Sequence, residues 1–79
     1  MKIIYLDHAK ENLAERKISK HLIKEAIHHP DEILESKKGR KIAHKLIGKK
    51  LLRVIYKHHP KAFIVITAYY TNPTRYMKQ

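Results

Sequence analysis

Apolar and polar residues follow two different periods along the chain, and the change of period divides it into two parts. Residues 2–6 form a short apolar run rich in β-branched side chains, which is typical of a strand. Asp7 follows as an expected helix N-cap, and helical spacing continues over residues 8–17. Ser19 is the expected N-cap of a second helix, which must end just before Pro30. The first part therefore predicts a strand and two helices.

After Pro30 the period falls from 3.6 to 2, the spacing of strands. Gly48-Lys49 predicts a tight two-residue turn between two of these strands. Two helices ahead of a mainly antiparallel, curved sheet of three to four strands make an α+β fold, in one domain over residues 1–79. The strands are expected over residues 32–35, 40–47, 50–57 and 61–71.

The predicted turn also determines which side chains share a face of the sheet. With residues 47 and 50 paired, His44 and Arg53 become direct cross-strand neighbours, although a slip of one residue would exchange the two faces. The face expected to pack under the helices carries Ala43, Leu52, Val54, Tyr56, Phe63 and Val65. The face expected to stay open carries Arg40, Ile42, His44, Arg53, Ile55, Lys57 and Ile64.

Charge narrows the class of partner. The chain has 18 Lys and Arg residues against 7 Asp and Glu residues, a formal net charge of +11. Such a field favours nucleic acid, an acidic protein or an anionic membrane surface. The absence of cysteine excludes disulfides, thiolate zinc sites and cysteine nucleophiles. No apolar run reaches the roughly 7–15 residues of a signal peptide or the roughly 20 of a membrane span, so a cytoplasmic protein is expected.

Basic residues concentrate around the predicted hairpin. Lysine and arginine near a nucleic-acid backbone displace condensed counterions, so this run predicts an RNA phosphate track. The structural alternative is a solvated hairpin whose lysines prevent unwanted strand pairing. The predicted RNA-binding residues are Lys37, Lys38, Arg40, Lys41, Lys45, Lys49, Lys50 and Lys57.

Ribonuclease chemistry needs a base for the 2′-OH, an acid for the leaving oxygen and a cation for the phosphorane. The chain offers these residue types, although each also has an ordinary structural role in a helix turn or a half-buried strand. The adjacent histidine pairs at 28–29 and 58–59 lack metal-ligand spacing, so no metal or cofactor is expected. The residues of suitable type are His8, His44, Arg53, Tyr69, Arg75 and Tyr76.

Several short segments together resemble a family of small, uncharacterised prokaryotic domains grouped with the RelE, ParE and BrnT toxins. They are Asp7-His8-Ala9, Glu15-Arg16-Lys17-Ile18-Ser19, Ala26-Ile27, Pro30-Asp31-Glu32-Ile33, residues 50–56 and residues 64–69. The resemblance implies a RelE-like fold with an open sheet face for RNA. It also implies that Arg53 and Arg75-Tyr76 take part in the toxin's action at the ribosome. His8 and Arg16 match the family's helix motif. Asn12 departs from the family, which often has a basic residue there.

The resulting expectation is a toxin-like endoribonuclease that cleaves mRNA at the ribosome without metal and is neutralised by an acidic antitoxin. His44 or His8 would act as the base, Arg53 and Arg75 would bind the phosphate, and Tyr69 or Tyr76 would orient the nucleobase. Two alternatives stay open: a non-catalytic basic module that binds nucleic acid, and a ParE-like protein poison of gyrase. The oligomeric state is also open, with a weak homodimer among the alternatives.

Overall fold

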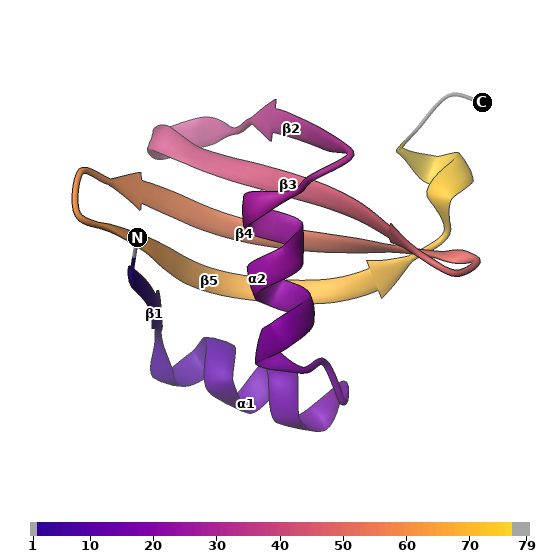
Figure 1. Ribbon diagram of the computed structural model, residues 1–79, viewed down its shortest axis with the longest axis horizontal. Helices are drawn as coiled ribbons and strands as arrows, with labels where there is room; N and C mark the ends of the chain where they lie inside the picture. Colours follow the sequence, from indigo (N-terminus) through magenta and orange to yellow (C-terminus); the bar gives the residue numbers. More distant parts are fainter. Residues whose placement is uncertain (1, 77–79) are drawn as a thin grey trace.

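The computed structural model describes residues 2–76 and confirms a small α+β fold (Figure 1). Two helices follow the first strand, and four further strands follow the helices, as the change of period predicts. The elements are β1 (Lys2–Tyr5), α1 (Asp7–Glu15), α2 (Lys20–His28), β2 (Glu32–Glu35), the short 3₁₀ turn η1 (Lys37–Gly39), β3 (Arg40–Ile47), β4 (Lys50–His59), β5 (Ala62–Thr71) and the 3₁₀ turn η2 (Pro73–Arg75).

The sheet contains five strands in the order β1-β5-β4-β3-β2, so the predicted count of three to four is wrong. Strands β2 to β5 pair antiparallel with their neighbours. The additional strand is β1, which pairs parallel with β5 from Lys2 opposite Ala62 to Tyr5 opposite Val65. The apolar pattern predicts that residues 2–5 are extended. It does not predict their pairing with β5, which is the last strand in the sequence.

The sequence signals match the ends of α2, whereas α1 differs at both ends and stops at Glu15 rather than at residue 17. Ser19 is the N-cap of α2, because its Oγ accepts a hydrogen bond from the Leu22 amide at 3.1 Å. Asp7 is not an N-cap: Leu6 occupies that position, and Asp7 is the first helical residue of α1. The carboxylate there still lies near the positive end of the helix dipole. Among the residues that the structure describes, no helix has the length and apolar content needed to cross a membrane.

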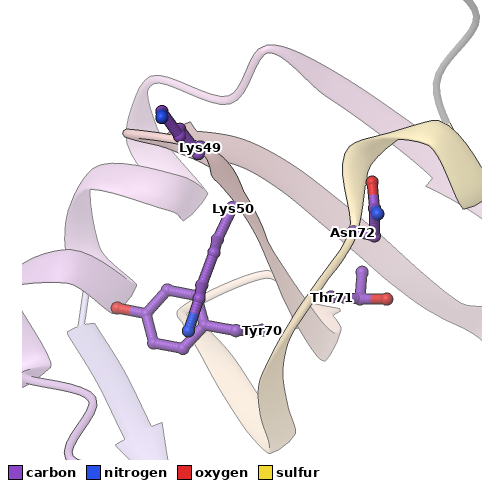
Figure 2. Close-up of a pocket in the computed structure, with 5 residues that line it drawn as sticks. All are labelled: Lys49, Lys50, Tyr70, Thr71 and Asn72. Atoms are coloured by element: carbon purple, nitrogen blue, oxygen red, sulfur yellow. The ribbon is translucent and has the colours of Figure 1, made fainter.

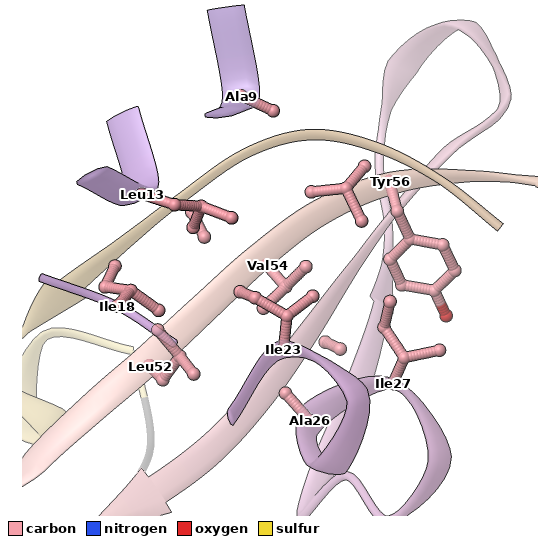
Figure 3. Packing of buried hydrophobic residues seen from close by; sticks show 12 residues of the cluster. Ala9, Leu13, Ile18, Ile23, Ala26, Ile27, Leu52, Val54 and Tyr56 are labelled. Atoms are coloured by element: carbon pink, nitrogen blue, oxygen red, sulfur yellow. The ribbon is translucent and has the colours of Figure 1, made fainter. Parts of the chain in front are cut away.

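Both helices pack on the same face of the sheet, with α1 along β5 and α2 across β3 and β4 (Figure 1). Figure 3 shows side chains of α1 and α2 meeting those of the central strand β4. The predicted helix-facing set is confirmed, because all six residues belong to this core or pack against it. The buried cluster consists of Ala9, Leu13, Ile18, Ile23, Ala26, Ile27, Ala43, Leu52, Val54, Tyr56, Val65 and Ala68.

A β-bulge interrupts the alternation of side chains in β5. Ile55 pairs with Thr67 while Tyr56 pairs with Val65, so Ile66 is an extra residue without its own partner on β4. Val65 and Ala68 both face the core, although they are three positions apart. The bulge therefore places Tyr69 on the open face, directly opposite Arg53.

Helix α1 supports β5 just beyond the bulge. Strand β1 stops pairing at Val65, and from there the side chains of α1 reach the outer edge of β5. Arg16 Nη1 donates to the carbonyl oxygen of Ala68 at 2.7 Å, and Asn12 Nδ2 donates to Thr67 Oγ1 at 2.9 Å. These bonds satisfy polar groups at a sheet edge that β1 no longer covers.

Two leucines in neighbouring strands test the assignment of the core. Leu52 is fully buried under the helices, whereas Leu46 is 45% exposed. We expect Leu52→Ala to lower the free energy of unfolding by about 2–5 kcal/mol, because it leaves a cavity. The same truncation at Leu46 should change it by less than about 0.5 kcal/mol. Urea unfolding of both variants measures the difference, and equal losses would contradict this assignment of the faces.

Candidate nucleic-acid site on the open sheet face

His44 and Arg53 are direct cross-strand partners on the face that carries no helix, which confirms the predicted register of the hairpin. Both side chains are nonetheless buried, with exposed fractions of 0% and 8%. The Tyr76 ring, which follows η2, lies 3.7 Å from Arg53 Cζ, and its centroid is 5.8 Å from that of His44. We call Glu32, His44, Arg53, Tyr69 and Tyr76 the open-face cluster.

The Arg53 guanidinium is buried without a carboxylate partner among residues 2–76. Its Nη1 donates to the Tyr69 hydroxyl at 2.8 Å, and the rings of Tyr76 and Tyr69 lie 3.7 and 5.6 Å from its Cζ. Its Nε is buried and has no hydrogen-bond partner within the described part of the chain. Aromatic faces and a phenol oxygen compensate a buried cation only in part. The geometry therefore suits an anionic ligand, and a guanidinium matches phosphate well.

His44 makes a different kind of contact, with a carboxylate. Its Nδ1 lies 2.9 Å from Glu32 Oε1, and its Nε2 is buried without a hydrogen-bond partner among residues 2–76. An ionised carboxylate can only accept, so Nδ1 donates in this bond, and a neutral imidazole held in this way has its lone pair on Nε2. That is the form that a general base requires.

Sequence analysis missed Glu32, although the signal for it was present. The sequence predicts a strand over residues 32–35, but it does not predict which strand pairs with it. The antiparallel register places Glu32 directly opposite His44, with both side chains on the same face. An acidic residue opposite a histidine in adjacent strands is thus the pattern that could have identified this pair.

Tyr69 is a neutral phenol over the physiological pH range. Burial raises its pKa above the usual 10.0, the positive charge of Arg53 acts to lower it, and Tyr76 raises it further. The hydroxyl can therefore accept from Arg53 while donating to another oxygen. A phenol in this state suits the role of a hydrogen-bond donor or acid.

The structure brings together the predicted site residues His44, Arg53, Tyr69 and Tyr76. His8 is exposed in the first turn of α1, and Arg16 is engaged at the edge of β5. Arg75 is exposed within η2, next to Tyr76 in the chain. Among residues 2–76, none of these other residues makes a hydrogen bond or ion pair with the open-face cluster.

The predicted RNA-binding residues do not form one continuous track. Lys37 and Lys38 lie in η1 at one end of β3, and Lys49 lies in the turn at the other end. Arg40 and Lys57 are cross-strand partners on the open face, so they flank the cluster. The remaining lysines, on the helix-covered face, are Lys41, Lys45 and Lys50.

Two of those lysines already make contacts within the protein. Lys41 Nζ lies 3.6 Å from a Glu35 carboxylate oxygen, and Lys45 Nζ donates to the carbonyl oxygen of His29 at 2.8 Å. The second contact satisfies a carbonyl at the C-terminus of α2, where a cation is favourable. These side chains are therefore poorly placed to bind phosphate.

The two His-His-Pro tripeptides come together around Phe63. The ring centroid of His28 lies 5.8 Å from that of Phe63, and His58 stacks on the same ring at 4.7 Å. Within residues 2–76, no three His, Cys, Asp or Glu side chains are grouped as metal ligands would be.

Two substitutions should move the pKa of Tyr69 in opposite directions. Tyr76→Phe removes a contact that raises this pKa, so the pKa should fall. Arg53→Met removes the charge that lowers it, so the pKa should rise further. The chemical shift of the Tyr69 ring carbon bearing the hydroxyl, followed against pH by NMR, reports both changes. Shifts of the same sign would contradict the described contacts.

Comparison with known proteins provides a family. Residues 5–70 match the family described as Domain of unknown function (DUF4258). A search of curated proteins returns no match. A search of solved structures also returns none. Because the matched region includes both helices and most of the sheet, the chain belongs to the DUF4258 family.

Proposed function

We propose that the chain is a toxin-like, metal-independent endoribonuclease with a RelE-like arrangement of helices and sheet. One observation carries the proposal: His44 lies directly opposite Arg53, and among residues 2–76 its Nε2 has no hydrogen-bond partner and Arg53 has no carboxylate partner. A base and a phosphate-binding cation on one face are what RNA cleavage through the 2′-OH needs. The fold alone would not support this choice, because one fold hosts many functions.

In the proposed reaction, His44 Nε2 takes the proton of the ribose 2′-OH. The 2′-oxygen then attacks the adjacent phosphorus, and the bond from phosphorus to the 5′-oxygen breaks. Arg53 stabilises the negative charge of the phosphorane, and the neutral Tyr69 hydroxyl donates to the leaving 5′-oxygen. The products are a 2′,3′-cyclic phosphate and a 5′-hydroxyl end. Glu32 positions His44 and stabilises its protonated form.

Tyr76 occupies the place that a nucleobase would take in this reaction. Its ring lies over the Arg53 guanidinium, and the residue is 39% exposed. Bases of single-stranded RNA commonly stack on guanidinium planes and aromatic rings. In the proposal, RNA displaces the Tyr76 ring and a base replaces it over the guanidinium.

The net charge of +11 supports the partners that the proposal requires. A strongly basic surface accelerates encounter with a polyanion such as the ribosome. The same surface would bind an acidic antitoxin, and both partners place the proposed activity in the cytoplasm. Arg40 and Lys57 extend positive charge along the face of the cluster.

Replacing Arg53 tests the proposal. Arg53→Met retains the length of the side chain and removes its charge, so we expect cleavage to fall roughly 10²- to 10³-fold, as on loss of a transition-state donor. Lys10→Met removes the same charge from an exposed position of α1, away from the open face, and should change cleavage little. Growth arrest and transcript ends after induced expression in a bacterium, with purified ribosomes and mRNA in parallel, measure the effect. Thermal unfolding checks that both variants fold.

Other outcomes of this experiment separate the competing functions. Growth arrest with intact transcripts would contradict the endoribonuclease and favour a poison of gyrase. RNA binding without arrest or cleavage would favour a non-catalytic module, whose affinity would fall steeply with salt. Equal loss of cleavage in Arg53→Met and Lys10→Met would show that total charge, rather than the cluster, is responsible.

A further inference from the structure

A pocket outside the open-face cluster lies where the β3–β4 turn meets the end of β5. Its volume is about 410 Å³, within the range of small-molecule sites. Figure 2 shows the Lys50 side chain extending toward the Tyr70 ring. The lining residues are Lys49, Lys50, Tyr70, Thr71 and Asn72.

The lining has the chemistry of a nucleotide site. Lys50 Nζ lies 5.8 Å from the centroid of the Tyr70 ring, and Lys49 is exposed in the neighbouring turn. Asn72 Oδ1 already accepts from the amide and hydroxyl of Thr74, which leaves the Asn72 Nδ2 group to donate to a ligand. Among residues 2–76, no carboxylate lines the pocket to neutralise the two ammonium groups. Two cations beside an aromatic face and an amide donor suit a phosphate and a base.

The position of Tyr70 connects this pocket with the cluster. Tyr69 and Tyr70 are consecutive in β5, so their side chains point to opposite faces of the sheet. Strand β1 pairs only as far as Val65, and Arg16 binds the carbonyl of Ala68. Beyond Ala68, the outer edge of β5 pairs with no other described strand. An extended chain can therefore pass around this edge from one face to the other.

We propose that this pocket binds one nucleotide of a single-stranded RNA whose adjacent segment occupies the open-face cluster. The base stacks on Tyr70, and Lys49 and Lys50 bind the phosphate. The inference rests on the proposed function for the identity of the ligand, and it adds a second contact surface on the opposite face. RNA recognition would then involve both faces at the end of β5.

Salt dependence of RNA binding tests the two lysines. The probe is a fluorescein-labelled single-stranded RNA with 2′-O-methyl riboses, which cannot be cleaved through the 2′-OH. We expect Lys49→Gln with Lys50→Gln to reduce the slope of log affinity against log salt by about 0.7, the contribution of one neutralised phosphate on a single strand. Lys10→Gln with Lys61→Gln removes the same charge from exposed sites outside the pocket and should leave the slope nearly unchanged. Equal changes of this slope in both double variants would overturn the proposal that the pocket binds RNA.

Two substitutions at Tyr70 test base stacking. Tyr70 packs against the core, so Tyr70→Phe preserves both the packing and the ring. Tyr70→Leu removes the ring and should weaken RNA binding roughly 5- to 100-fold, the usual range for loss of a stacked base. The phenylalanine variant should bind as the wild type does, and thermal unfolding checks both. Wild-type affinity in Tyr70→Leu, with the fold intact, would overturn the proposal.

Cleavage assays on the same variants separate this inference from the proposed function. Weak binding by the pocket variants, with no cleavage by the wild type, would support the pocket and contradict the endoribonuclease. Cleavage that Arg53→Met abolishes, with normal RNA binding by every pocket variant, would support the endoribonuclease and contradict the pocket.

Discussion

The open face depends on the burial of one positive charge. Arg53 lies on the central strand with only 8% of its surface exposed, and it has no carboxylate partner among the described residues. Tyr69 from β5 and Tyr76 after η2 provide the contacts that the charge needs inside the protein. These contacts hold the segment after β5 against the sheet. They also leave capacity for an anion, because neither tyrosine neutralises the guanidinium.

The position of Tyr69 depends in turn on the other side of the molecule. If the side chains alternated regularly through Ile66 instead of forming a bulge there, Tyr69 would lie on the helix-covered face with Val65. Helix α1 supports the shifted register through the bonds of Asn12 and Arg16 to the edge of β5. Asn12 therefore has a structural role at this edge, where it is buried and donates to Thr67.

The two faces of the sheet carry different kinds of residue. The helix-covered face buries almost all of the apolar core, whereas the open face gathers the titratable groups with unsatisfied atoms. Some of the positive charge is already engaged within the protein, because Lys41 contacts the Glu35 carboxylate and Lys45 donates to the carbonyl oxygen of His29. The net charge therefore exceeds the positive charge that is available for a ligand, and local contacts decide which basic side chains remain available.

The sequence by itself determined the helices, the strands after Pro30, and the β3–β4 hairpin with His44 opposite Arg53. These features depend on the local period of apolar residues and on a two-residue turn, which are encoded over a few neighbouring positions. Only the tertiary structure decided that β1 joins β5, that Ile66 forms a bulge, and that Glu32 and Tyr76 meet His44 and Arg53. Each of those contacts joins segments whose approach depends on packing the whole sheet, and short-range patterns carry little information about such packing.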